Sequence, residues 1–450
     1  MKKLFILLLI LIVGGSAFVY FSPIFEKVPP KITILNNGYT NLKNPIKIEI
    51  NDNRGIKGYD VIMIANNRAT QLAHQENLNQ KSITLNLSLP KNINAKTITL
   101  IIKAYDTSKW HFFTGNKSEA KSELIVDKTP PMIDILTHSY GIGKGGSAAA
   151  VVEVRDKNLE DKYILVNNKY KFKLTPFVKD GYYASLIAWP ITEDSFDATL
   201  VAIDKAGNKS TMHIPYYWRS GRIYSPKIVK ITITDKFINQ VAKRVLSKMG
   251  FEIPNDPIEI FKLVNEKVRK INEKEISQIT SQIYENRVSS FYLNPFNPLP
   301  GSAKKADFGE IRHYFYHNEE ISKSIHKGID LAKVRHAKIY ASNYGKVVAS
   351  KYIGIYGNAL IIYHKLGLYT LYGHTSKFKV KKGDSVRRGM VIAYTGATGA
   401  VFGDHLHFGV YIQGHPVQPI EWMDKHWIKV NISNIINSAR RMINKWNKKA

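Results

Sequence analysis

The first strongly apolar segment lies at the N-terminus. Lys2 and Lys3 precede an apolar run from Leu4 to Phe21 that has no polar face. Positive residues followed by an apolar core are typical of an export signal, and the run is about long enough to cross a bilayer. Residues 15–17 resemble a signal-peptide cleavage site, but residues 18–21 continue the apolar stretch, which favours an uncleaved inner-membrane anchor over a cleaved signal. Both alternatives place the rest of the chain outside the cytoplasm: in the periplasm if the anchor is kept, or secreted if the signal is cleaved.

Apolar and polar positions alternate in the segment that follows. Ile46, Ile48 and Ile50 show this pattern. A period of two, interrupted by Asn and Gly turns, predicts half-buried β-strands. After the N-terminal anchor or signal (residues 1–21), we therefore expect two immunoglobulin-like β-sandwiches at residues 22–127 and 128–219.

The two predicted sandwiches are copies of one module. The recurrences are Pro29-Pro30 as Pro130-Pro131, Asp52 as Asp156, Asp106 as Asp204, and Gly115-Asn116-Lys117-Ser118 as Gly207-Asn208-Lys209-Ser210. The lag is about one hundred residues, the size of one β-sandwich. The resemblance to bacterial immunoglobulin-like domains predicts a fold but assigns no activity.

Apolar residues at helical spacing appear in two later segments. Stretches beginning near Phe237, Ile258 and Ile276 predict a small helical insert within residues 220–290. Residues 432–450 predict a basic amphipathic C-terminal helix, which we expect to dock on its own domain rather than on an anionic membrane. Its apolar face holds Ile432, Ile435, Ile436, Ala439, Ile443 and Trp446, and its basic residues are Arg440, Arg441, Lys445, Lys448 and Lys449.

Short strands return between these two helical segments, at residues 291–431. Tight turns such as Gly345-Lys346 and Gly383-Asp384 lead into apolar strands. The predicted fold class is therefore mainly β. It consists of two sandwiches, a small helical insert and a C-terminal β-sheet domain with a terminal helix.

Composition narrows the choice of partners. The 450 residues include 65 Lys plus Arg and 36 Asp plus Glu, for a formal net charge of +29. This charge favours an acidic cell wall or anionic lipid, but no recognition motif accompanies it, so we expect no nucleic-acid partner. The chain has no Cys, so a zinc site must use His and carboxylate ligands. No sequence feature indicates an oligomeric state.

Histidine is concentrated in the predicted C-terminal β-sheet domain. Ten of the 14 His lie between His313 and His426. His405 and His407 are two residues apart, so a strand would project both to one side while Leu406 faces a core. This pair offers two imidazoles to a common site.

A second group can complete a metal site. His326 and Asp330 are four residues apart, and Gly328 allows the backbone to turn so that both bind one ion. One imidazole of the later pair would make two nitrogen ligands and one oxygen ligand. Three protein ligands with an open fourth position are typical of catalytic zinc, which acidifies water and polarises a carbonyl. His374 and the remaining imidazole would handle protons near neutral pH.

These groups resemble the lysostaphin-type zinc endopeptidases, which hydrolyse peptidoglycan and have a duplicated-hybrid-motif-like β-fold. The resemblance covers about residues 305–425. The matching blocks are His326-x-Gly328-x-Asp330, Gly357-Asn358, Leu371-Tyr372-Gly373-His374, Val380-x-x-Gly383-Asp384-x-Val386, and Gly396-x-Thr398-Gly399 before His405-Leu406-His407-Phe408. It implies that His326, Asp330 and His407 bind zinc and that His374 and His405 are catalytic. Thr375 departs from the leucine often found there.

We interpret a second histidine pair, His313 and His317, as structural and not as metal ligands. His313 and His317 have the spacing of a helical zinc motif, but the Glu that follows the first His in His-Glu-x-x-His enzymes is missing. The segment is aromatic and favours a strand.

The expected function is zinc-dependent hydrolysis of peptide cross-links in peptidoglycan during cell-wall remodelling. A D-alanyl–diaminopimelate bond is expected over a glycine bridge. One alternative is a catalytically inactive relative that binds the wall and activates another hydrolase, and another is a structural adhesin. All five key residues are present, which favours the enzyme.

The helical insert suggests control of the site. Its apolar residues need a surface to cover, and a peptidase groove is one such surface. Residues 294–298, Glu310 or Glu319 would be the plug in this hypothesis. The alternative is that the helices only pack beside the domain.

Overall fold

The N-terminal apolar run forms one helix, α1 (Lys2–Phe21), which is long and apolar enough to cross a membrane by length and composition. The computed structural model describes residues 2–221 and 224–446. The chain divides into two units, and each is described by itself. One comprises the residues up to Pro131 with Asp156–Asp161 and Ile203–Ser210, and the other comprises the remainder.

The first unit contains a seven-stranded sheet organised by one long strand, β3 (Ile46–Ala65). The first half of β3 pairs with β1 (Lys31–Leu35) and β5 (Gln80–Leu87), and its second half pairs with β4 (Arg68–Gln75) and β6 (Thr97–Asp106). β7 (Lys117–Val126) and β2 (Tyr39–Thr40) complete the sheet. The alternating residues of β3 and β6 are buried in one core, which explains the period of two in the sequence. Two short helices flank it, η1 (Pro23–Phe25) and α2 (Trp110–Phe113).

The second β-module has two antiparallel four-stranded sheets. One has the order β13 (Thr175–Phe177), β14 (Lys179–Ala188), β10 (Ser147–Arg155) and β8 (Met132–His138). The other has the order β12 (Tyr170–Lys173), β11 (Leu159–Val166), β15 (Ala198–Asp204) and β16 (Lys209–His213). A short parallel pair joins β9 (Gly141–Gly143) to β17 (Tyr217–Arg219).

The C-terminal domain is built on an eight-stranded sheet. Its order is β19 (Ala303–Ala306), β22 (Ile329–Ala332), β30 (Leu406–Ile412), β26 (Leu368–Gly373), β25 (Asn358–Tyr363), β24 (Gly345–Tyr352) and β28 (Ser385–Val386), with β31 (His415–Val417) on β30. Two three-stranded sheets accompany it. They are β18 (Ile228–Thr232) with β20 (Ile311–Tyr316) and β21 (Glu319–Ile325), and β23 (Lys338–Tyr340) with β29 (Val391–Tyr394) and β27 (Lys377–Phe378). The fold class is mainly β, as the sequence predicts.

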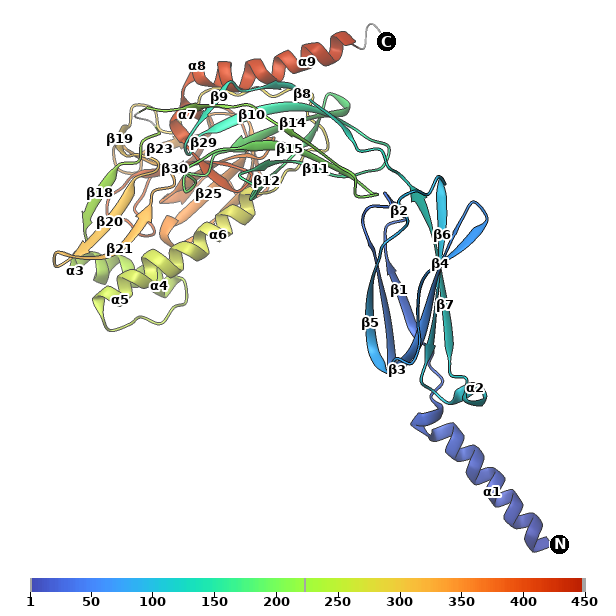
Figure 1. Cartoon of the computed structure of the whole chain (residues 1–450). Coiled ribbons are helices and arrows are strands. Elements are labelled where there is room, and N and C mark those ends of the chain that lie inside the picture. The colour runs from blue at the N-terminus through green and yellow to red at the C-terminus, as the bar shows by residue number, and fades with distance from the viewer. Residues whose placement is uncertain (1, 222–223, 447–450) are drawn as a thin grey trace. The chain divides into compact units, whose positions relative to one another are not determined.

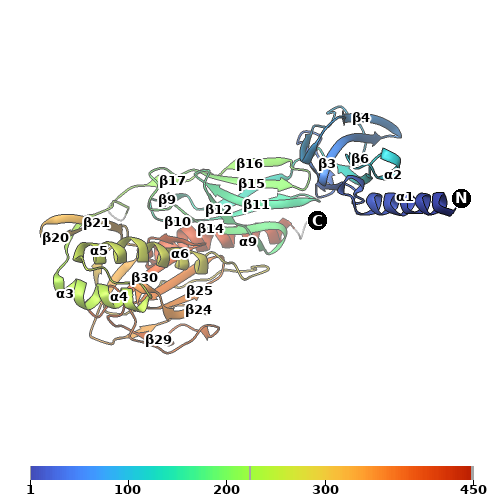
Figure 2. The same cartoon turned by 90° about the horizontal axis from the view of Figure 1, so that it is seen from below.

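The helical insert packs directly on this domain, beside β30, β25 and β24 (Figure 2). It consists of α3 (Asp235–Phe237), η2 (Ile238–Ala242), α4 (Lys243–Lys248), α5 (Pro257–Lys262), η3 (Leu263–Val268) and α6 (Arg269–Thr280). Thr234 and Asp256 cap two of the helix starts with their side-chain oxygens. Val245, Leu246 and Val268 share one core with Tyr356 of η4 (Gly354–Tyr356) and with Leu371. The insert is therefore an integral layer of the domain.

The last helices run from α7 (Pro419–Met423) through α8 (Lys425–Ile428) and η5 (Lys429–Ser433) to α9 (Asn434–Trp446). Ile432, Ile436, Ala439 and Ile443 are buried, and α9 packs against β8 and β10 of the second β-module (Figure 1). Thr137 of β8 donates a hydrogen bond to the carbonyl of Ile435. Arg440 and Arg441 face solvent. The apolar face is thus covered by protein, and Lys448 and Lys449 lie outside the described residues.

Candidate active site

Two residues of the site face each other across neighbouring strands. Asp330 on β22 is the register partner of His407 on β30, and Oδ1 of Asp330 lies 3.0 Å from Nδ1 of His407. Side chains of directly paired residues lie on the same face of an antiparallel sheet, which explains why they meet. Leu406 and Phe408, which flank His407, are fully buried.

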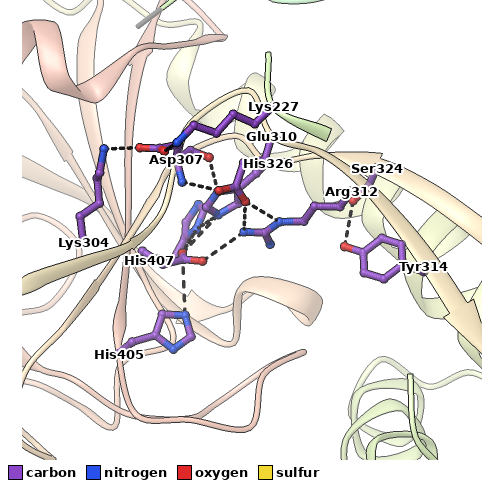
Figure 3. Close-up of polar contacts among 11 residues, drawn as sticks. Lys227, Lys304, Asp307, Glu310, Arg312, Tyr314, Ser324, His326, His405 and His407 are labelled. Atoms are coloured by element: carbon purple, nitrogen blue, oxygen red, sulfur yellow. Dashed lines mark hydrogen bonds and ion pairs between the residues drawn. The ribbon is translucent and has the colours of Figure 1, made fainter. Parts of the chain in front are cut away.

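His326 joins this pair from the turn between β21 and β22. Its Nε2 lies 3.1 Å from Nδ1 of His407 and 3.2 Å from Oδ1 of Asp330. Its Nδ1 lies 2.8 Å from the carbonyl oxygen of Asp307. A carbonyl only accepts, so Nδ1 carries the proton and Nε2 presents a lone pair to the cluster. Figure 3 shows His326 and His407 converging there.

The cluster fits a metal ion. His326, Asp330 and His407 each offer one ligand atom, and these atoms lie within 4.8 Å of one another. Nε2 of His407 is buried and has no hydrogen-bond partner among the described residues. An ion on Nδ1 of His407 would leave the proton on that Nε2. Two imidazole nitrogens and one carboxylate oxygen are a donor set typical of catalytic zinc.

Gly328 gives His407 the space that it occupies. A Cβ atom at this position would lie 2.6 Å from Nε2 of His407. Any side chain would therefore displace the imidazole from the cluster. This close approach, rather than an unusual backbone angle, explains the glycine between His326 and Asp330.

Asp307, whose carbonyl accepts a hydrogen bond from His326, is itself fixed by other contacts. The carboxylate of Asp307 forms ion pairs with Lys227, at 2.5 Å, and with Lys304 (Figure 3). The backbone N–H of Asp307 donates to Glu310. Such partners fix the orientation of a ligating imidazole.

His374 and His405 form the outer part of the site. Their ring centroids lie 4.8 Å apart, and Nε2 of His405 lies 3.8 Å from Oδ1 of Asp330. Nδ1 of His374 lies 2.9 Å from the carbonyl of Thr398, and Nδ1 of His405 lies 2.8 Å from that of Gly403. Each therefore carries its proton on Nδ1 and has a free lone pair on Nε2. Both imidazoles are suited to accept a proton.

Two interlocked loops position His374. The hydroxyl of Thr398 accepts from the N–H of Asn358 and donates to the carbonyl of Thr375. Gly357 has a φ of 64°, and a Cβ atom there would lie 2.4 Å from the backbone of Thr398. The Gly357-Asn358 and Thr398 motifs thus shape the loop that accepts the His374 proton. Asn358 has a structural role here.

The segment that holds these five residues matches a known family. Residues 324–419 match Peptidase family M23. They form an M23 peptidase domain, of the lysostaphin type.

Curated relatives match this M23 domain. The DD-carboxypeptidase/endopeptidase Mpg of Neisseria meningitidis serogroup B is 37% identical over 123 residues, which cover 27% of this chain and 27% of the relative. The peptidoglycan DD-endopeptidase ShyB of Vibrio cholerae is 41% identical over 96 residues, 21% of this chain and 22% of the relative. The matches thus span about a quarter of the length of these curated relatives.

Solved structures also match this chain. The catalytic domain of lysostaphin from Staphylococcus simulans is 25% identical, with 27% of this chain and 92% of that chain covered and a TM-score of 0.24. A zinc-containing peptidase from Vibrio cholerae is 14% identical, with 78% and 87% covered and a TM-score of 0.27.

Burial sets the protonation of the site. Burial opposes ionisation of Asp330, but attraction and hydrogen bonds from His326 and His407 hold its pKa well below the usual range. Burial lowers the pKa of His407 to about 4. Burial, followed by repulsion from His405 and His407, lowers the pKa of His374 well below the usual range. These two histidines are therefore neutral at neutral pH, the form that binds metal or accepts a proton.

Arg312 contacts the site from outside the M23 domain. It lies on β20, and its Nη2 lies 3.3 Å from Oδ2 of Asp330 and 3.1 Å from a carboxylate oxygen of Glu310. Its side chain is only 18% exposed. The oxygen of Asp330 that faces away from the two histidines is thus paired with a shielded guanidinium.

The site lines a small cavity of about 80 Å³ that is partly open to solvent. The helical insert contributes Arg269, β20 contributes Arg312 and Tyr314, and the loop before His405 contributes Ala400 and Val401. Such a volume accommodates an ion and a few water molecules.

The side chains of His313, Phe296 and Glu310 contact residues other than the three proposed metal ligands. His313 is on strand β20 and contacts Glu320 at 3.0 Å, and His317 is in the following turn. Phe296 packs against Phe408 in the core. Glu310 pairs with Arg312. On strand β20, the described side chain that contacts Asp330 is therefore that of Arg312. The sequence did not suggest this contact.

Proposed function

We propose that this protein is a zinc-dependent endopeptidase that hydrolyses peptide cross-links of peptidoglycan. The observation that carries the proposal is the convergence of Nε2 of His326, Oδ1 of Asp330 and Nδ1 of His407. His374 and His405 direct proton-free Nε2 atoms into the same space. This is a metal donor set accompanied by two bases.

His326, Asp330 and His407 would hold the ion. Zinc would supply Lewis acidity toward the scissile carbonyl and would acidify a water molecule. His405 is the more exposed base, with 16% of its side chain accessible, and would take a proton from the attacking water. His374 is buried and neutral, and its Nε2 lone pair would accept a hydrogen bond from the attacking water and so orient it.

The substrate in this proposal is the D-alanyl–diaminopimelate cross-link. One relative of the M23 domain is named a peptidoglycan DD-endopeptidase and another a DD-carboxypeptidase/endopeptidase. The net charge of +29 favours an acidic wall polymer as a partner. Helix α1, as an inner-membrane anchor, would keep the enzyme on the periplasmic side of the membrane, next to this substrate.

The test is digestion of purified sacculi by the full chain in detergent micelles after zinc loading. The fragments are separated and identified by mass. The proposal predicts loss of cross-linked dimers and gain of monomers that carry a free diaminopimelate amine. Asp330→Asn, which keeps the size of the side chain, is the matched control and should release none. An inactive activator would give no fragments with either protein.

A further inference from the structure

A second cluster of carboxylates lies in the first β-module, far in sequence from the M23 domain. Glu26 follows η1, Asp52 lies in β3, and Asp106 ends β6. Each offers one oxygen, and these oxygens lie within 4.8 Å of one another. Asp52 and Asp106 are 8% and 0% exposed. Three acidic side chains thus share one shielded site.

Two oxygens of the cluster have no donor. Oε2 of Glu26 and Oδ2 of Asp52 are buried and without a hydrogen-bond partner among the described residues. Buried anionic oxygens without partners are strongly unfavourable. Arg54 is the nearest cation in sequence to Asp52, but its guanidinium donates to the carbonyl of Pro23. The missing counter-charge indicates a bound cation.

The other atoms of the cluster are rigidly held. Oδ1 of Asp52 accepts from the N–H groups of Arg54 and Gly55 at 2.9 and 2.7 Å. Asp106 accepts from the N–H and the side-chain amide of Asn116 at 2.8 and 2.6 Å. These bonds orient the carboxylates before any ion binds, which reduces the entropic cost of binding.

The second module provides an internal comparison. Asn208 donates to Asp204 at 2.7 Å and to the carbonyl of Asp127 at 2.9 Å, as Asn116 donates to Asp106 and to the carbonyl of Glu26. There, however, the amide of Asn158 donates to the carboxylate of Asp127 at 3.1 Å. The residue at the position of Asn158 in the first module is Arg54, which donates to Pro23 instead. The first module alone lacks this internal donor.

We propose that Glu26, Asp52 and Asp106 bind one Ca²⁺ ion. An all-oxygen set of carboxylates suits a hard cation, and Ca²⁺ accepts irregular oxygen geometry more readily than Mg²⁺. The ion fixes the segment that follows α1 onto the β-module, because Glu26 belongs to that segment. The carbonyl of Glu26 is already held by Ser108 and Asn116 at 2.6 and 2.8 Å.

The test uses the full chain in detergent micelles with zinc present throughout. Calcium binding is measured by titration calorimetry and by thermal unfolding with and without CaCl₂. One site per chain is expected, with a Kd on the order of 10⁻⁴–10⁻³ M, as in extracellular calcium modules. Calcium should raise the unfolding temperature, and MgCl₂ at the same concentration should raise it less.

Asp52→Asn is the decisive variant. It keeps the acceptor for Arg54 and Gly55, and its new amide can donate to Glu26. The calcium-dependent shift should disappear, while the calcium-free protein stays at least as stable as the wild type. Asp156→Asn, at the equivalent position of the second module, should keep the full shift.

Three results with calcium would overturn the proposal: no calcium response in the wild type, an undiminished response in Asp52→Asn, or its loss in Asp156→Asn. If Asp52→Asn does not fold by circular dichroism, Glu26→Gln is used in its place. A magnesium response equal to that of calcium would also contradict the assignment.

Discussion

Asp330 presents its two carboxylate oxygens to opposite partners: Oδ1 contacts Nδ1 of His407 at 3.0 Å, while Oδ2 contacts Arg312 at 3.3 Å. The strand register sets the first contact, because Asp330 and His407 are direct partners on β22 and β30. The second contact comes from β20, outside the M23 domain. Asp330 therefore links the proposed metal site to the layer that covers it.

The first prediction separates the proposed ligands from the proposed bases. His326→Ala, Asp330→Ala and His407→Ala should lose most of their zinc, because each removes a converging ligand atom. His374→Ala and His405→Ala should keep zinc and lose activity by about 10²–10⁴-fold, the usual contribution of acid–base catalysis. Elemental analysis and sacculus digestion measure the two properties. Equal zinc loss in all five variants would contradict this division.

The second prediction concerns Arg312. Its guanidinium orients Asp330 and compensates its charge, so Arg312→Ala should weaken zinc affinity by about 10-fold or more, as outer-shell changes do. Competition with a zinc chelator measures the affinity. Arg269→Ala is the matched control, because Arg269 also lines the cavity but pairs with Asn265. An unchanged affinity in Arg312→Ala would show that the ion pair does not support the metal site.

The third prediction concerns access of substrate to the site cavity. Phe237 of the insert and Phe402 of the loop before His405 have ring centroids 5.3 Å apart, and the chain has no Cys. Phe237→Cys/Phe402→Cys treated with a short bismaleimide should digest sacculi at least about tenfold more slowly than the untreated protein, because a linked insert and loop cannot separate to admit substrate. Single Phe237→Cys is the control. Full activity after cross-linking would show that the covering layer need not move.

The fourth prediction concerns pH and stability. Glu421 is buried, and its carboxylate accepts from Ser147 of the second β-module and from Tyr224. Burial raises its pKa from 4.5 to about 7. Between these two pKa values the folded state keeps a proton that the unfolded state releases. The contribution of Glu421 to the free energy of unfolding therefore falls as pH rises from about 4.5 to 7 and is constant above pH 7.

Glu421→Gln should remove this decline, which is on the order of 3 kcal/mol at most. Calorimetric unfolding across this pH range measures it, with the exposed Glu252→Gln as the control. Parallel pH profiles for the wild type and Glu421→Gln would disprove the raised pKa.

The five candidate site residues could be selected from the sequence because their spacing carries geometric information. His405 and His407 are two residues apart, and the structure brings both to one site although β30 begins only at Leu406. Gly328 was expected to let the backbone turn between His326 and Asp330, whereas in the structure a Cβ atom at this position would meet the imidazole of His407.

Arg312 could not be selected in this way. It precedes His313, whose spacing from His317 resembles a zinc motif. Neighbouring strand residues face opposite sides of the sheet, so this spacing gives no information about the side chain of Arg312. Arg312 and Tyr314 line the site cavity, whereas His313 contacts Glu320. The position of β20 over the site depends on its pairing with β18 and β21, which local periodicity does not encode.

The helical insert was predicted as an element, but its role depends on tertiary packing. Its apolar periodicity indicated helices with one buried face. That the face joins Tyr356 and Leu371 in one core follows only from the folded structure. Removal of residues 220–290 would therefore expose the core of the M23 domain, and point variants are the cleaner test of control.

Hydrolysis of a defined cross-linked muropeptide dimer tests the central claim most directly. The zinc-loaded full chain is incubated with a dimer joined by a D-alanyl–diaminopimelate bond, and the products are identified by mass. The account predicts two monomers whose summed mass exceeds that of the dimer by one water, formed by the wild type and not by Asp330→Asn. An intact dimer with the zinc-loaded wild type, or equal cleavage by both proteins, would contradict it.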